Sequence, residues 1–436
     1  MGRAAPPRVA HRMASCRPHR PERQSWRPPI EERRMRAYDF RAANYPVRLY
    51  SGQDAAANIK TEVARNRGQR AFILCGRTLA RKTALIERMR ERLGELCAGV
   101  YDEMEKDSPL GPILAARDAA RAQEADAVIA VGGGSVIQAA RVVAILLAEK
   151  GDPHELCTQY PEGRPAQSVK LLQPKVPIIN VCTTATSAMN RAGSGVKDPE
   201  ADHRLEFFDP KTRPKAVYWD AEALLTAPVS LARSSSLSVY WRSLMNLGAL
   251  DMNPLVEGDR LQAFRLAARA LPRVVDPEDA GPRIEMCAAA FLHNRDQDDG
   301  GNIVERHWVM RVVYAFATAL FNRYPHIGQG EANAALTPHV LRKLGYRNPR
   351  EMVRIAEALE AFPAGAAETD APARAADALA RQFADLCMPA RLRELQVPED
   401  GLEAIVADSM KNFNADPKRE FLQHRDELAE TLRACW

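Results

Sequence analysis

The most constraining feature of the sequence is a short apolar run that ends in three glycines and continues as an apolar helix pattern. The run covers residues 128–131 and is followed by Gly132, Gly133, Gly134 and Ser135. Short β-branched runs of this kind are typical of a parallel strand that is covered on both faces. Glycines leave the backbone free to bend sharply and to approach a ligand closely. Because the N-terminus of a helix attracts phosphate, the turn predicts a nucleotide or dinucleotide site.

The same pattern has a plainer interpretation as a tight turn between a strand and a helix, because a short glycine pattern is weak on its own. A second polar feature follows the strand-like segment 176–181, where the hydroxyl cluster 183–187 begins with Thr183 and Thr184. Hydroxyl groups at a strand end can donate to a phosphate, a ribose or a carboxamide. They can equally bond to neighbouring backbone groups, so both interpretations stay open.

Strand and helix patterns alternate through the first half of the chain. The strand-like segments are 71–75, 99–101, 127–131, 176–181 and 216–219, with helix patterns at 78–96, 112–123 and from 136 onward. This alternation predicts a doubly wound parallel sheet, in which ligands bind at the carboxyl ends of the strands. From residue 221 onward helix patterns dominate, at 255–271, 306–321, 349–361 and 373–386. We therefore expect a nucleotide-binding α/β domain (38–220) and an all-helical domain (221–436), with the active-site cleft between them.

Composition narrows the class of protein and its partners. The chain has 436 residues, 46% of them hydrophobic and 27% charged, which is ordinary for a soluble globular protein of two domains. No apolar run approaches the roughly 20 residues that a membrane-spanning helix needs, so we expect no membrane partner. Eight scattered cysteines without a CxxC pair or a zinc spacing indicate a reduced, cytoplasmic protein.

The positive net charge comes from the first residues. Segment 1–37 holds ten arginines against three glutamates, a balance of +7, whereas the whole chain carries +5 and the remainder therefore −2. A mildly acidic body argues against nucleic acid as a partner. The basic tail is rich in proline and is expected to be disordered. It is either an organelle transit peptide or the product of a start codon assigned too early, with Met35 as the true start; we favour the second.

Taken together, these segments resemble the iron-containing (group III) alcohol dehydrogenase family, which shares its superfamily with dehydroquinate synthase. The likeness runs from about residue 38 to the C-terminus. Gly-Gly-Gly-Ser at 132–135 matches the family's GGGSxxD motif, and residues 183–184 match its threonine pair. Residues 209–220 match the segment that leads into the family's helical domain. Residues 330–334 and 338–340 match its HGxANA and PHV motifs. The resemblance implies a dehydroquinate synthase-like fold, in which a nucleotide-binding α/β domain precedes an all-helical domain.

The resemblance also implies hydride transfer between NAD or NADP and an alcohol, aldehyde or ketone, assisted by a divalent metal on one aspartate and three histidines. This chain departs from that ligand set. Leu237 stands at the aspartate position and Trp241 at the first histidine, segment 314–318 replaces the HxxxH stretch, and Gln329 stands at the last ligand. Leucine and tryptophan cannot ligate such a cation, and tyrosine and glutamine are poor substitutes. We expect no metal of the family type.

Three histidines lie near these positions, namely His307, His326 and His339. None has the i, i+4 spacing of ligands on one helix, so each is more simply read as a hydrogen-bonded or solvent-facing side chain. A shifted alignment would make His326 a surviving ligand. It is also the candidate for a titrating group near the cleft, because histidine can change charge near neutral pH.

The cofactor half departs from the family as well. Gln138 stands at the aspartate of GGGSxxD, and Arg141 stands at the following lysine, where it could fork onto a phosphate. Gly76 occupies the position where many NAD-preferring members place an acid, and Arg77 follows it. An arginine there could accommodate a 2′-phosphate, which favours NADP slightly; a solvated residue at a helix start is the alternative. Where the family has the motif GTGSE, this chain has Thr-Ser-Ala-Met-Asn at residues 186–190. We therefore expect its contacts with the substrate to differ from those of the family.

Three functions fit these observations. The first is a metal-independent oxidoreductase acting on a small alcohol, aldehyde or oxo-acid, in which Arg242, Tyr314 and His326 stabilise the developing charge. Arg242 could pair with an anionic substrate, as in reductases of oxo-acids, or form an internal ion pair with Asp251 or Glu305. The second is a non-redox lyase or decarboxylase that keeps a bound nucleotide. The third is a non-catalytic cofactor-binding protein. A small-molecule substrate is the expected partner, and a homodimer is a possible assembly.

Overall fold

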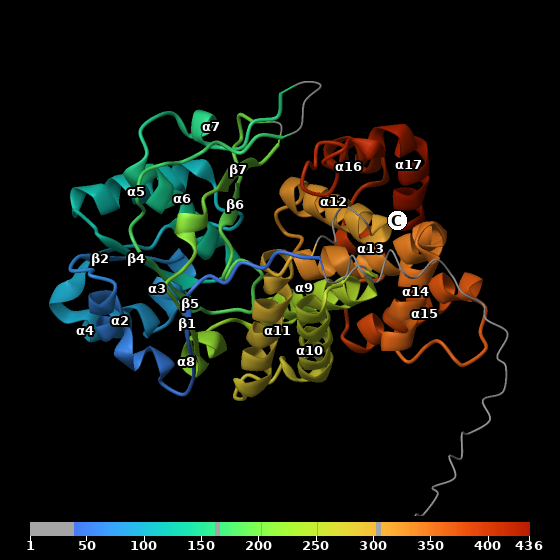
Figure 1. Ribbon diagram of the computed structural model, residues 1–436, viewed down its shortest axis with the longest axis horizontal. Coiled ribbons are helices and arrows are strands. Elements are labelled where there is room, and N and C mark those ends of the chain that lie inside the picture. Colours follow the sequence, from blue (N-terminus) through green and yellow to red (C-terminus); the bar gives the residue numbers. More distant parts are fainter. Residues whose placement is uncertain (1–38, 162–165, 202, 251, 302–306) are drawn as a thin grey trace, which may run out of the picture.

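The computed structural model describes residues 39–161, 166–201, 203–250, 252–301 and 307–436. The predicted basic tail at residues 1–37 lies outside these ranges, as do Asp251 and Glu305. Figure 1 shows two units side by side, an α/β unit and a helical unit, with a hairpin of two short strands between them.

The α/β unit is built on a six-stranded sheet in the order β1-β8-β5-β4-β2-β3, in which every neighbouring pair is parallel. Its strands are β1 (Arg48–Gly52), β2 (Ala71–Leu74), β3 (Cys97–Tyr101), β4 (Ala127–Gly132), β5 (Ile178–Cys182) and β8 (Ala216–Asp220). The central strands β2, β4, β5 and β8 are buried along their whole length. This explains why their sequences are continuous apolar runs rather than alternating patterns.

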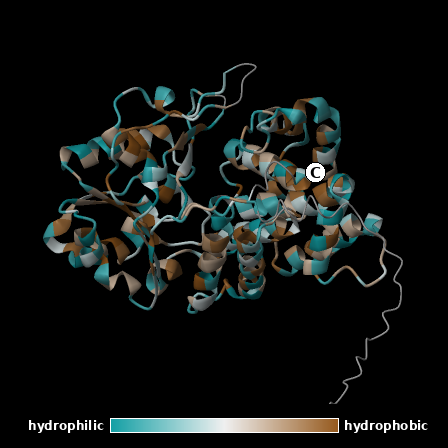
Figure 2. Cartoon of the chain, in the orientation of Figure 1, coloured by the Kyte–Doolittle hydropathy of each residue, from teal (hydrophilic) through white to brown (hydrophobic). Residues whose placement is uncertain are grey.

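Helices cover both faces of the sheet. Alternate residues of the strands pack with α2 (Ile59–Arg65) and α4 (Leu85–Leu93) on one face, and with α5 (Leu110–Ala122) and α6 (Gly134–Ala148) on the other. Figure 2 shows hydrophobic residues along the strands and on the helix sides that face them. The predicted doubly wound parallel sheet is therefore confirmed.

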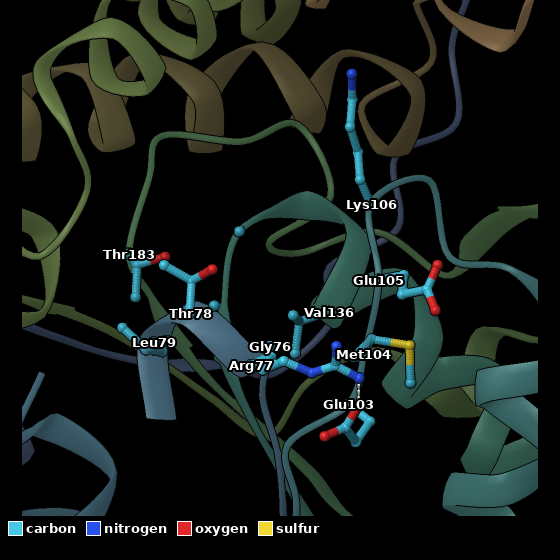
Figure 3. Close-up of a pocket in the computed structure, with 12 residues that line it drawn as sticks. Gly76, Arg77, Thr78, Leu79, Glu103, Met104, Glu105, Lys106, Val136 and Thr183 are labelled. Atoms are coloured by element: carbon cyan, nitrogen blue, oxygen red, sulfur yellow. Dashed lines mark ion pairs between the residues drawn. The ribbon is translucent and has the colours of Figure 1, made fainter. Parts of the chain in front are cut away.

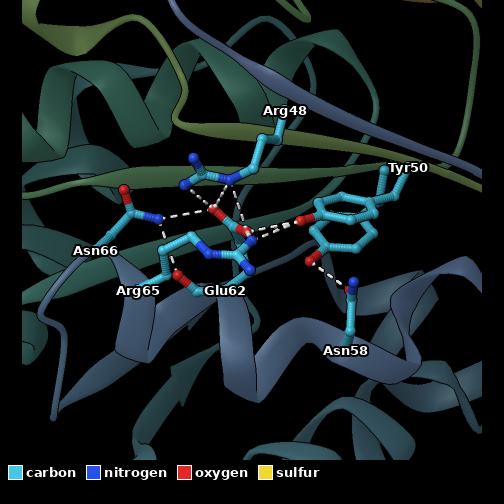
Figure 4. Close-up of polar contacts among 7 residues, drawn as sticks. Arg48, Tyr50, Asn58, Glu62, Arg65 and Asn66 are labelled. Carbon is cyan, nitrogen blue, oxygen red and sulfur yellow. Dashed lines mark hydrogen bonds and ion pairs between the residues drawn. The ribbon is translucent and has the colours of Figure 1, made fainter.

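The edge strand β1 was not predicted, because its residues are mostly exposed and form no apolar run. It is held instead by a polar cluster around Glu62 of α2, a carboxylate whose residue is only 1% exposed. Arg48 Nε donates to both carboxylate oxygens at 2.9 and 3.0 Å, and the Tyr50 hydroxyl donates at 2.8 Å (Figure 4). The ring of Tyr50 also stacks on that of Tyr218, with 4.8 Å between centroids. The residues that make these contacts are far apart in sequence, so no local sequence pattern predicts strand β1.

The single helix predicted over 78–96 is wrong, because two helices occupy it: α3 (Arg77–Lys82) and α4. Thr83 interrupts them in an extended conformation, with φ −135° and ψ 159°. Its hydroxyl donates to the carbonyl of Leu79 at 2.7 Å and accepts from the N–H of Leu85 at 3.3 Å. The side chain thus ends one helix and begins the next, as threonine hydroxyls often do.

The hairpin of β6 (Gly193–Val196) and β7 (Leu205–Phe208) was also not predicted. It packs on α6 and reaches the helical unit, where it meets the end of α12 (Trp308–Arg323). Lys197 Nζ donates to the carbonyl of Asn322 at 3.2 Å, and Arg204 Nε donates to its side-chain oxygen at 2.9 Å. The hairpin therefore joins the two units next to the site described below.

In the described part of the chain no strand follows β8, and the second unit is helical. Its helix α9 (Val229–Gly248) is central and packs against four others. The helices are α8 (Ala221–Leu225), α9, α10 (Pro254–Ala270), α11 (Gly281–Asp298), α12, α13 (Gln329–Leu344), α14 (Pro349–Ala358), α15 (Ala371–Asp385), α16 (Leu402–Ser409) and α17 (Arg425–Ala434). None of the described helices combines the length and apolarity needed to cross a lipid bilayer.

Gly258 offers a simple test of helix propensity in this unit. It lies inside α10, is exposed, and a Cβ built on it meets no atom within 4 Å. We expect Gly258→Ala to raise the free energy of unfolding by about 1 kcal/mol, because alanine loses less backbone entropy in a helix. Urea unfolding of the two proteins measures this difference, and an unchanged or lower stability would contradict it.

Candidate active site

A cavity of about 460 Å³ lies at the carboxyl edge of the sheet (Figure 3). Its walls come from the segments that follow β2, β3, β4 and β5, which are brought together because all four strands are parallel and end at this edge. The lining residues are Gly76, Arg77, Thr78, Leu79, Glu103, Met104, Glu105, Lys106, Gly132, Gly133, Val136 and Thr183.

The glycine turn forms one wall of the cavity. Strand β4 ends at Gly132 and α6 begins at Gly134, and the N-cap residue Gly133 has no side chain that could cap the helix. A Cβ on Gly132 would lie 2.7 Å from Val136 Cγ2, and one on Gly133 would lie 3.0 Å from Thr184 Oγ1. A side chain has no room at Gly132 and little room at Gly133, and no side chain among the described residues accepts from the first backbone N–H groups of α6. The turn has the geometry of a phosphate cradle at a helix N-terminus.

Five of the predicted cofactor residues line this cavity: Gly76, Arg77, Gly132, Gly133 and Thr183. The other five do not line it: Gly134 and Thr184 pack at the turn itself, whereas Ser135, Gln138 and Arg141 bond to neighbouring segments. A Cβ on Gly134 would lie 2.8 Å from Thr186 Oγ1, and Thr184 contacts Gly133 as described above. Ser135 Oγ accepts from the N–H of Asp107 at 3.0 Å, and Gln138 Oε1 accepts from the N–H of Gly195 at 3.0 Å.

Arg141 does not take the phosphate position that its alignment with the family lysine suggested. Its residue is 1% exposed, and its hydrogen bonds go to the segment after β5 and to the hairpin. Nη1 donates to the carbonyls of Ala188 and Arg191 at 2.6 and 3.0 Å, and Nε donates to Ser194 Oγ at 3.0 Å. Burial lowers the pKa of Arg141 to about 9. The reason for the difference is tertiary, since these acceptors lie about 50 residues away in sequence.

Glu103 is a cavity residue that we did not predict. It follows β3 and forms an ion pair with Arg77 (Figure 3). A second ion pair joins it to Arg81 at 2.9 Å. The side chain of Arg77 is 59% exposed, so this pair is partly solvated. The rule that ligands bind beyond the carboxyl ends of strands would have drawn attention to this position.

One lining residue, Lys106, contacts the helical unit. Lys106 Nζ donates to the carbonyls of Pro325 and Ile327 at 2.5 and 3.0 Å, in the loop between α12 and α13. His326 lies in the same loop and is exposed, with Nε2 at 2.9 Å from the carbonyl oxygen of Leu395. Among the described residues, no hydrogen bond or ion pair joins His326 to Arg242 or Tyr314.

Arg242 and Tyr314 lie close enough for their charges to interact, although no hydrogen bond between described residues joins them. Arg242 lies on α9 and Tyr314 on α12, and their side chains interact electrostatically. The interaction also includes Arg191, which follows the hydroxyl cluster, and His293 of α11 is near both arginines. Arg191 and His293 were not predicted, because only the tertiary structure places them beside Arg242.

The positions of the family's metal ligands do not suit a divalent cation here. Leu237 is fully buried, Trp241 is 2% exposed, and Gln329 is an exposed first residue of α13. In the ranges that the structure describes, no three histidine, cysteine, aspartate or glutamate side chains are arranged to hold a metal. The donors at the four aligned positions therefore do not fit the group.

His307 and His339, the other two histidines considered as metal ligands, make structural contacts. His307 is fully buried and caps α12, accepting at Nδ1 from the N–H of Met310 at 3.2 Å, and burial lowers its pKa to about 4. His339 Nε2 lies 3.0 Å from the carbonyl oxygen of Ala390.

Comparison with known proteins places the chain in a family. A model described as iron-containing alcohol dehydrogenase matches residues 46–221, and one for the C-terminal part of the Fe-containing alcohol dehydrogenase family matches residues 247–436. The chain is 26% identical over 343 residues to 1,3-propanediol dehydrogenase of Citrobacter freundii, covering 77% of this chain and 83% of that protein.

One further relative and one solved structure cover almost the whole length. The chain is 24% identical over 406 residues to maleylacetate reductase 2 of Cupriavidus pinatubonensis, covering 91% of this chain and 97% of that protein. The crystal structure of NADH-dependent butanol dehydrogenase A from Thermotoga maritima shares the fold, with a TM-score of 0.77, 17% identity and coverage of 91% and 99%. Since the two family models together span most of its length, the chain belongs to the iron-containing alcohol dehydrogenase family.

Proposed function

We propose that this chain is an NAD(P)-dependent oxidoreductase that acts on a small alcohol, aldehyde or oxo-acid without the family's metal. The observation that carries the proposal is the glycine cradle, which opens into a cavity at the carboxyl edge of the sheet. The related dehydrogenases support an oxidoreductase, and the structurally similar butanol dehydrogenase is NADH-dependent. A bound nicotinamide cofactor would donate a hydride to a carbonyl substrate in its reduced form, or accept one from an alcohol in its oxidised form.

The residues of the chain have distinct roles in this proposal. Gly132 and Gly133 admit the pyrophosphate to the N-terminus of α6, and Thr183 contacts the cofactor from the next strand. Tyr314 and Arg242 stand near the positions of the family's metal ligands. We assign to Tyr314 the stabilisation of the alkoxide oxygen, which the metal provides in other members of the family, and place Arg242 beside it in the substrate site.

Calorimetry tests the proposal directly. NADH and NADPH are titrated into chelator-treated protein, and the titrations are repeated after addition of ferrous iron or zinc. We expect at least one of the two cofactors to bind equally well in both states, because the aligned ligand positions hold no suitable donors. Binding that appears only with metal would overturn the metal-free assignment. No binding in either state would overturn the oxidoreductase and leave a repurposed scaffold.

The choice between NAD and NADP depends on how Arg77 is paired. We place Arg77 beside the adenosine ribose, which favours NADP slightly. In the free protein its guanidinium is paired with Glu103, so Glu103 competes with a 2′-phosphate for it. We expect Glu103→Gln to raise the ratio of kcat/KM for NADPH over NADH about tenfold, because it frees a charged donor for the 2′-phosphate.

Glu105→Gln is the matched control, since Glu105 lines the same cavity and has no ion pair among the described residues. Both variants remove one negative charge, but only Glu103→Gln releases an arginine. Equal shifts in the two variants would mean that Arg77 does not contact the cofactor.

A further inference from the structure

We propose that Arg191 and Arg242 bind a carboxylate of the substrate, so that the enzyme acts on a small oxo-acid or hydroxy acid rather than on an uncharged alcohol or aldehyde. This inference rests on the proposed function and names its substrate class. It follows from the way in which the two arginines are buried and lack an ion pair with any residue that the structure describes.

Both arginines have buried nitrogen atoms that lack a partner. Arg191 Nε and Arg242 Nε are inaccessible to solvent and make no hydrogen bond to any described residue. The residues as a whole remain partly exposed, so they are not sealed in the core. A buried, charged donor without a partner is unfavourable, and natural proteins retain such groups mainly where a ligand satisfies them.

The charges of the two side chains also act on each other. Burial, and after it the positive charge of Arg242, lowers the pKa of Arg191 to about 10. Burial lowers the pKa of Arg242 as well. His293 does not add a third charge, because burial and then the two arginines lower its pKa well below the ordinary value. The resting protein therefore holds two cations together in a site of reduced solvation.

The nearest carboxylates are already engaged by other arginines. Both Arg191 and Arg242 are attracted to Asp296, but Asp296 accepts two hydrogen bonds from Arg260, at 2.7 and 2.9 Å. Asp298, at the end of the same helix, is likewise held by Arg213, through hydrogen bonds of 2.9 and 2.6 Å. In the part of the chain that the structure describes, the site thus keeps an excess of positive charge.

The backbone that carries Arg191 is rigid. Segment 187–191 is held by Arg141, which donates to the carbonyls of residues 188 and 191. Asn180 of β5 donates to the carbonyl of residue 189 at 2.8 Å, and Asn294 of α11 donates to that of residue 187 at 2.9 Å. Both units of the protein therefore fix this segment, so little conformational entropy remains to be lost when an anion binds.

These features favour a permanent anion over a neutral carbonyl compound. The alkoxide of a neutral substrate carries one negative charge and only during the reaction, whereas two arginines are charged at all times. A carboxylate matches the planar fork of a guanidinium and can accept bidentate hydrogen bonds. Tyr314, which interacts electrostatically with both arginines, is then left for the carbonyl oxygen that is reduced.

Binding of malonate, with malonamide as its uncharged analogue, tests the site without catalysis. In calorimetry we expect malonate to bind and malonamide not to bind. Arg191→Met and Arg242→Met should each weaken malonate binding roughly 100-fold, as expected for a desolvated charge pair. Arg269→Gln is the control, because Arg269 is an exposed arginine paired with Glu285. Unchanged binding in both methionine variants would overturn the proposal.

Thermal unfolding without any anion separates a ligand site from a structural ion pair. Removing an unpaired buried cation should raise Tm by about 2–4 °C in Arg242→Met, and malonate should raise Tm of the wild type only. A lower Tm in Arg242→Met would indicate that Arg242 has a structural partner and would overturn the proposal. The sequence alternatives Asp251 and Glu305 would then be tested as that partner by Asp251→Asn and Glu305→Gln.

Turnover separates this inference from the proposed function. Small 2-oxo and 3-oxo acids are compared with their methyl esters, using the preferred nicotinamide cofactor. We expect kcat/KM to be about 100-fold higher for the acids, with the difference lost in both arginine variants mainly through KM. Equal turnover of acids and esters would overturn the substrate class while the oxidoreductase stands. Absence of cofactor binding would overturn the proposed function, whereas malonate binding would still report on the anion site.

Discussion

Gly330→Ala is expected to lower the free energy of unfolding by about 3 kcal/mol or more. A Cβ at Gly330 would lie 2.2 Å from the carbonyl oxygen of Ser234 and 2.8 Å from its Cα, so the backbones of α13 and α9 are in direct contact. Backbone atoms cannot move aside as a flexible side chain can, and the helices must separate. Urea unfolding measures the loss.

Gly258→Ala is the matched control, because it is the same substitution inside a helix of the same unit but with open space around it. The two variants should change stability in opposite directions. Since α9 also carries Arg242, we expect Gly330→Ala to weaken malonate binding even where the protein remains folded. Wild-type stability in Gly330→Ala would mean that the two helices are not in close contact.

The second large effect is expected at the glycine turn. Gly133→Asp should weaken binding of NADH or NADPH by at least about 100-fold. The new side chain would place a Cβ 3.0 Å from Thr184 Oγ1 and a negative charge where the proposal places the pyrophosphate. Fluorescence titration of the reduced cofactor measures the dissociation constant.

Gly111→Asp serves as the control for charge at a helix start. Gly111 lies in the first turn of α5, is exposed, and has no atom within 4 Å of its Cβ position. An acidic residue in the first turn is favourable to a helix, so this variant should fold and bind the cofactor as the wild type does. Equal affinity of Gly133→Asp and the wild type for the cofactor would mean that the cofactor does not bind at the glycine turn.

Helix α6 connects the two halves of the proposed site. Its N-terminus forms the glycine cradle, and Arg141, two turns further on, fixes the segment that carries Arg191. Arg141 thus acts through another residue and is a positioning residue rather than a ligand of phosphate. This arrangement would couple the placement of the cofactor to that of the substrate carboxylate through one rigid element.

The features that could be predicted from the sequence are those with local causes. The buried strands appear as apolar runs because both faces of the sheet are covered, and the helices of the second unit appear through their periodicity. The glycine turn was recognisable because its tight geometry leaves no room for a side chain at Gly132 and little room at Gly133. Motif order along the chain was enough to identify the family, which the family models confirm.

The contacts between distant segments were decided by the tertiary structure alone. The sequence positions of Arg141 and Arg77 predicted contacts with the cofactor. In the structure Arg141 donates to the segment after β5, and Arg77 forms an ion pair with Glu103. Arg191 and Arg242 come from different units, and no spacing in the sequence relates them. Charge and hydrogen bonding act through space, whereas strand and helix patterns act along the chain. The sequence by itself therefore determined the framework, and packing of the two units determined which polar groups meet in the site.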